Sequence, residues 1–163
     1  MAKKVLLVLV LGLAGISPAI TGEPERKSLA GISGMNLVVE ILDDGALEAQ
    51  LNEEQLRTEV EGKLRLAKIN VDPQYSPYMN VRINCALPKS ASGQDMGYVA
   101  MVRVAFMQDV YVMENSHNMY APTWESRMFI WGSKGNFGID AVKSTRNLMD
   151  QFISDYLAAN KKK

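Results

Sequence analysis

Hydrophobic and polar residues follow strand-like patterns over much of the chain. A near-continuous apolar run over residues 35–42 predicts a buried, central strand. Over residues 78–87 apolar and polar residues alternate, which is typical of a half-buried strand. Residues 98–113 and 119–131 predict two longer strands joined by a polar turn.

Two further segments have helical periodicity. Asn52 stands three residues before Gln55, a capping-box spacing that predicts a helix start. The apolar stripe that follows consists of Leu56, Val60 and Leu64. Residues 139–160 repeat apolar positions every three or four residues and predict a C-terminal helix.

The resulting order, β-α-β-β-β-α, predicts an α+β fold. Strands joined by short turns form antiparallel neighbours, whereas the first strand connects through a helix. We therefore expect a two-layer sandwich in which a mostly antiparallel, four-stranded sheet carries two helices on one face.

The start of the chain resembles a signal peptide over residues 1–19. A positively charged start precedes an apolar run over residues 5–16, and small residues follow at 17–19. We expect cleavage after Ala19, with Thr21 as the second choice; an uncleaved anchor or a buried N-terminal strand is the alternative. The protein is therefore expected to be periplasmic or secreted, with no stable membrane span once the peptide is removed.

The remaining chain divides into three parts. Residues 20–33 contain Gly, Pro and Ser among charges and predict a flexible leader. Residues 34–160 form a single α+β domain, and the lysines at 161–163 form a basic tail.

Composition excludes several classes of function. The 163 residues contain 18 basic and 18 acidic side chains, so the basic excess of a nucleic-acid-binding protein is absent. One His and one Cys are too few for most metal sites, His-based catalytic triads or disulfide scaffolds. We therefore expect no enzymatic activity, no cofactor and no metal.

Individual residues add little catalytic chemistry. Cys85 falls on the apolar side of its strand, which predicts a buried, unreactive thiol, with an intermolecular disulfide as the alternative. Gly132, Gly135 and Gly138 have a spacing that matches no phosphate-binding loop and predict a flexible connection. His117 is expected in a solvated turn.

One side of the long strand predicted over residues 98–113 is the candidate contact surface. Its members are Val99, Met101, Met107, Tyr111 and Met113. Two helices with one apolar stripe each cover only one face of a sheet, so one side of this strand remains uncovered. Arg103 and Asp109 interrupt the Met-bearing side, which we therefore expect to face outward. Burial of that side under helices is the alternative.

Three segments resemble a family of small, exported, uncharacterised bacterial proteins. They cover residues 55–65, 78–84 and 148–157. The element order is also similar to the outer-membrane lipopolysaccharide-assembly lipoprotein and, more loosely, to the amino-terminal domain of the Tol-system periplasmic protein. The chain lacks the lipidated cysteine of the first and the propeller of the second. The resemblance implies export and a compact domain.

These observations favour a non-enzymatic exported module that binds or assembles with another envelope protein, or with itself, through an exposed sheet face or edge. The rival hypothesis is a carrier with a pocket for a small apolar ligand between helices and sheet. An enclosed apolar cavity favours the carrier, and a packed interior beside an exposed apolar strip favours the protein partner.

Overall fold

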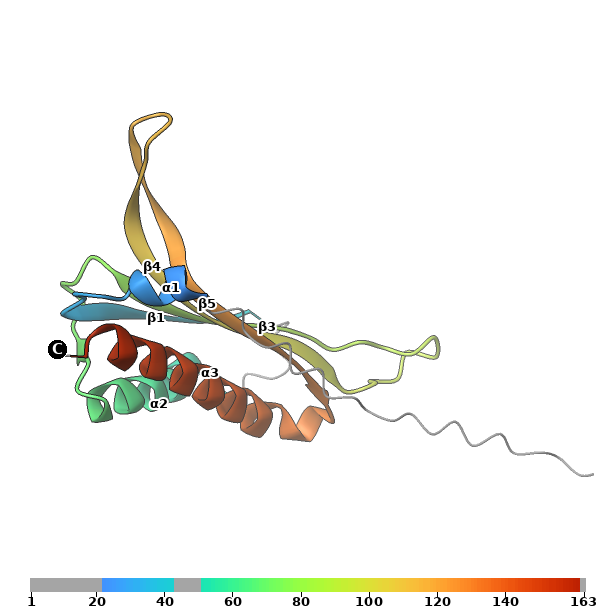
Figure 1. Ribbon diagram of the computed structural model, residues 1–163. Coiled ribbons are helices and arrows are strands. Elements are labelled where there is room, and N and C mark those ends of the chain that lie inside the picture. The colour runs from blue at the N-terminus through green and yellow to red at the C-terminus, as the bar shows by residue number, and fades with distance from the viewer. Residues whose placement is uncertain (1–21, 43–50, 162–163) are drawn as a thin grey trace, which may run out of the picture.

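The computed structural model describes residues 22–42 and 51–161. One sheet is covered on a single face by the helices α2 and α3 (Figure 1). The elements in chain order are α1 (Glu23–Lys27), β1 (Gly34–Leu42), α2 (Glu53–Leu66), β2 (Asn70–Val71), β3 (Tyr78–Ala86), β4 (Tyr98–Val112), β5 (His117–Gly132), the 3-10 helix η1 (Lys134–Asn136) and α3 (Phe137–Ala159). The α+β class and the placement of two long helices on one face agree with the prediction.

The sheet differs from the predicted one in strand number and direction. It has five strands in the order β2-β1-β3-β4-β5. β1 is parallel to both β2 and β3, whereas β4 is antiparallel to β3 and β5, so the sheet is mixed. The prediction missed β2 because two residues are too few to show a period. β1 and β3 are parallel because α2 carries the chain back across the sheet between them.

The interval 20–33 is not a flexible leader where the structure describes it. Residues 23–27 form α1, and the Leu29 side chain is completely buried. Asn160 accepts a hydrogen bond from the Gly31 backbone N–H at 2.9 Å, which fixes this segment to the end of α3. Its partners lie near the other end of the chain, so no local pattern reveals them. The predicted signal peptide and residues 162–163 of the tail lie outside the described residues.

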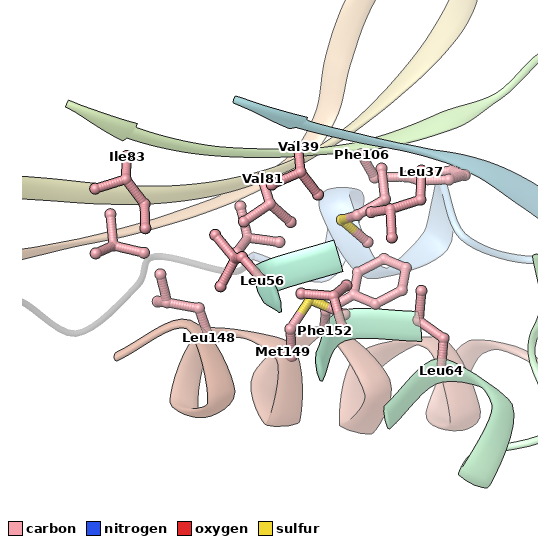
Figure 2. Packing of buried hydrophobic residues seen from close by; sticks show 14 of the residues in the cluster. Leu37, Val39, Leu56, Leu64, Val81, Ile83, Phe106, Leu148, Met149 and Phe152 are labelled. Atoms are coloured by element: carbon pink, nitrogen blue, oxygen red, sulfur yellow. The ribbon is translucent and has the colours of Figure 1, made fainter. Parts of the chain in front are cut away.

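The core lies between the sheet and the helices α2 and α3 (Figure 2). Phe152 of α3 is at its centre, with its ring 5.8 Å from that of Phe106 and 5.1 Å from that of Trp124. The predicted capping box of α2 is present: Asn52 accepts from the Gln55 backbone N–H at 2.9 Å. These contacts fix both helices to one face, so neither α2 nor α3 covers the other face of the sheet.

The glycine-rich segment is ordered rather than a flexible connection. Gly132 ends β5, and the next residues form η1 and the start of α3. A Cβ at Gly97 would lie 2.2 Å from the carbonyl oxygen of Gly132, and Gly97 has a φ of +105°. Glycine is therefore required at position 97, where the chain enters β4 beside the end of β5.

Candidate interaction surface on the open face of the sheet

The structure assigns the two sides of β4 as the alternation predicts. Tyr98, Val102 and Phe106 face α2 and α3 and are buried. On the other side, Val99 is 48% exposed and Met101 is half-buried. We call this side of the sheet the open face; whether it contacts a partner remains a prediction.

The predicted contact residues divide into two groups. Val99 and Met101 lie close together at one end of the open face. Met107 is half-buried, and Tyr111 and Met113 lie farther along the hairpin, 61% and 82% exposed. The structure therefore does not unite all five residues in one patch.

Neighbouring residues of β5 enlarge the first group. Val99 pairs with Trp131 and Met101 with Phe129, and these two aromatic side chains are 56% and 62% exposed. We call these four residues the apolar end. Alternation along β5 places Trp131 on the opposite face from Trp124, which is buried. Sequence reasoning selected contact residues on β4 alone. It did not select Phe129, although the same alternation along β5 puts Phe129 beside Trp131.

A row of charged residues crosses the open face beside the apolar end. Arg82, Arg103 and Arg127 are direct partners on β3, β4 and β5, and we call them the arginine row. Like charges placed opposite one another destabilise a sheet. Two carboxylates offset this repulsion: Glu40 accepts from Arg82 at 2.7 Å, and Glu125 accepts from Arg103 at 2.7 Å.

The hydrogen-bond donors around Glu40 and Glu125 lower the pKa values of both carboxyl groups. Hydrogen bonds from Asn80 and Arg82 lower the pKa of the Glu40 carboxyl below its ordinary value. The hydrogen bond from Arg103 likewise lowers the pKa of Glu125. Arg127 is exposed and forms no ion pair within the described part of the chain. Its charge also helps to lower the pKa of the neighbouring Glu125 carboxyl, but of the three arginines it is the most exposed to a partner.

The hairpin of β4 and β5 leaves the plane of the sheet at a β-bulge. Phe106 pairs with Trp124 but Met107 pairs with Pro122, so Thr123 is the additional residue on β5. Bulges bend the strand that carries them. Beyond this point residues 107–122, which we call the arm, rise away from the side of α2 and α3 (Figure 1).

The base of the arm is fixed and its end is exposed. Tyr120 forms a hydrogen bond with Ser76 at 2.7 Å between the two hydroxyl oxygens, and its ring lies 5.8 Å from that of Tyr78. Residues 113–120 are all exposed, including Met119 at 53%. The arm contains two acids, Asp109 and Glu114, and no Lys or Arg.

A groove of about 300 Å³ runs between the outer edge of β5 and the first half of α3. It is lined by Tyr98, Met128, Phe129, Ile130, Trp131, Asp140, Lys143, Ser144 and Asn147. The Tyr98 hydroxyl donates to Asp140 at 2.5 Å, and burial, together with this carboxylate, raises the pKa of Tyr98. The groove is open to solvent and does not form an enclosed cavity.

The described residues offer little other chemistry. His117 is exposed, and Cys85 is half-buried at the border of the core rather than fully enclosed. Over residues 22–42 and 51–161, no three His, Cys, Asp or Glu side chains gather as ligands for a metal ion. Within the same ranges, no helix has the length and apolar content needed to cross a bilayer.

Comparisons with known proteins give structural similarity only. No protein-family model and no curated protein matches the chain. Two structures of the PelC dodecamer from Paraburkholderia phytofirmans are similar, one of a variant with 14% identity and a TM-score of 0.41 over 82% of this chain and 92% of that one. The other has 11% identity and a TM-score of 0.37 over 82% and 93%.

A minor lipoprotein from Acinetobacter baumannii is similar at 8% identity, with a TM-score of 0.26 over 78% of this chain and 94% of that one. Rare lipoprotein B from Shewanella oneidensis has 14% identity and a TM-score of 0.24 over 76% and 87%. Similarity at this level assigns no function, so the function must be argued from the open face itself.

Proposed function

We propose that the chain is a non-enzymatic exported module, periplasmic or secreted, that binds another protein of the cell envelope through the open face of its sheet. The observation that carries this proposal is the apolar end, where exposed Val99, Phe129 and Trp131 lie beside half-buried Met101 and no helix within residues 22–42 and 51–161 covers them. Adjacent exposed apolar side chains of this size are typical of contact surfaces.

Export is supported by the order of charged, apolar and small residues over positions 1–19. The absence of catalysis is supported by composition, since a single His and a single Cys are too few for most His-based or Cys-based catalytic sites. Binding of a protein is therefore the activity that fits the residues available.

A carrier of a small apolar ligand is the alternative, and the groove between β5 and α3 is the observation in its favour. That groove lies at the sheet edge and is open to solvent. The space between sheet and helices is instead occupied by buried side chains such as Phe106 and Phe152. The packed interior beside an exposed apolar strip favours a protein partner.

The test is capture of partners from an envelope extract with two baits. Met101→Asp places a carboxylate in the apolar end and is expected to lower the amount of the captured partner, because a buried charge opposes docking. Met96→Asp, at a methionine 69% exposed on the β3–β4 loop, is the matched control and should capture as the unmodified chain does. Circular dichroism checks that both variants are folded. Equal capture by both variants, or unfolding of Met101→Asp, contradicts the proposal.

A further inference from the structure

The arm and the open face carry opposite charge. Asp109 and Glu114 are exposed acids on an arm that has one histidine, His117, and no Lys or Arg. Arg127 is an exposed base without an ion-pair partner in the described residues, beside Arg103. Complementary charges of this kind select partners and guide their approach.

Within one molecule these charges do not meet. The bulge at Thr123 directs the arm away from the sheet, so the end of the arm stands clear of the open face (Figure 1). The acids of the arm and the exposed guanidinium of Arg127, which forms no ion pair within the described residues, therefore remain accessible to another molecule.

The dimensions of the two surfaces also fit. The β4 side of the arm, residues 107–112, spans about 20 Å at about 3.4 Å per residue. The four strands β1, β3, β4 and β5 span about 14 Å at about 4.8 Å per interval. An arm from a second molecule is therefore long enough to lie across the whole open face, where its exposed Tyr111 and Met113 would meet Phe129 and Trp131.

We propose that the occupant of the open face is a second copy of this chain, in a two-fold symmetric pair in which the arm of each copy lies across the open face of the other. In such a pair every contact occurs twice. One acidic arm and one basic face in each copy therefore suffice to form both halves of the interface. This inference rests on the proposed function, because it names the partner of the same face.

Charge reversal in the full chain tests the pairing, with the dimer dissociation constant measured by sedimentation over a range of concentrations. Arg127→Glu is expected to weaken the dimer about tenfold or more, as loss of a contact made at two equivalent sites. The double variant Asp109→Arg with Glu114→Arg should weaken it by a similar factor. Combining all three changes restores the opposite charges and should recover most of the affinity.

The control is Arg65→Glu on α2, whose side chain is 67% exposed on the helical side of the molecule. It should leave the dimer unchanged. A chain that stays monomeric at the highest concentration measured, or a dimer insensitive to Arg127→Glu, overturns the inference. If the chain is monomeric but Met101→Asp still abolishes capture of an envelope protein, self-association is wrong and the proposed function stands.

Discussion

Asp155 is a buried carboxylate that connects three elements. It lies on α3, is 8% exposed, and accepts hydrogen bonds from Trp124 Nε1 on β5 and Arg26 Nε on α1, each at 3.0 Å. Loss of the acceptor of a buried indole N–H lowers the free energy of unfolding, because water cannot reach the N–H to replace the hydrogen bond. This side chain therefore links α1 and α3 to β5 through hydrogen bonds.

Asp155→Ala is expected to lower the free energy of unfolding by about 2 kcal/mol, because it leaves the Trp124 N–H without an acceptor. Urea unfolding followed by tryptophan fluorescence measures the loss. Asp155→Asn keeps a carbonyl oxygen for the indole and should lose less. Equal losses for the two variants would show that the hydrogen bond to Trp124 is not the source of the stability.

The carboxylates of the open face make stability depend on pH. The pKa values of Glu40 and Glu125 are lowered from the ordinary value of 4.5, so the folded chain binds fewer protons than the unfolded chain near that pH. Their contribution is present above about pH 4.5 and is lost as pH falls through the lowered pKa values.

Denaturant unfolding between about pH 6 and about pH 3 should therefore show falling stability. In Glu40→Gln that acid-dependent fall should be smaller. A profile identical to that of the unmodified chain would contradict the role of the Glu40 ion pair.

At the residue scale, the sequence predicts which face of the sheet a strand residue occupies. It does not predict which residues of neighbouring strands are paired. Alternation along β4 suffices to place Val99 and Met101 together and opposite Tyr98. The alignment of Arg82 with Arg103 and Arg127 depends on how separate strands pair, which no single strand encodes. The arginine row could not be predicted for this reason.

At the scale of the elements, the arm contributes little to the core, because none of its residues is buried. The residues near its end are exposed, while its base is held through Tyr120 and Ser76. Local structure with few buried contacts adds little to global stability. The contacts at its base, and not burial in the core, therefore hold the arm in place.

Replacing residues 111–118 by an Asn-Gly turn joins Val110 to Met119, which are already cross-strand partners. We expect the free energy of unfolding to change by less than about 1 kcal/mol, because the removed side chains are largely exposed. Thermal unfolding measures this, and loss of self-association is expected in the same variant. A large drop in stability would mean that the arm supports the fold rather than a contact.

Long elements were predictable and short ones were not. β4, β5 and α3 repeat their apolar period often enough to be read from the chain, and the structure agrees with each within a few residues. α1 has no buried residue of its own, and β2 is two residues long, so neither carries a periodic signal. Both exist because distant segments hold them.

At the scale of the whole molecule, the helices cover only one side of the sheet. This follows from the number of apolar faces that the helices present. Two long helices cover one side of the sheet, and the interior is filled from that side (Figure 2). Sequence reasoning reached this arrangement because each helix has a single apolar stripe. It did not foresee the arm leaving the sheet, since the bulge at Thr123 appears only when β4 and β5 are paired.

The attachment of residues 26–32 to α3 sets the order in which the chain completes its folding. Arg26, Leu29, Gly31 and Ile32 bond to side chains that follow between 124 and 131 positions later. A chain made from its N-terminus produces this segment early and its partners last, and closing so long a loop is entropically slow. The hydrogen bonds of residues 29–32 to Tyr156 and Asn160 at the end of α3 therefore form last. Until these two residues have been synthesised, the N-terminal segment cannot reach its folded position.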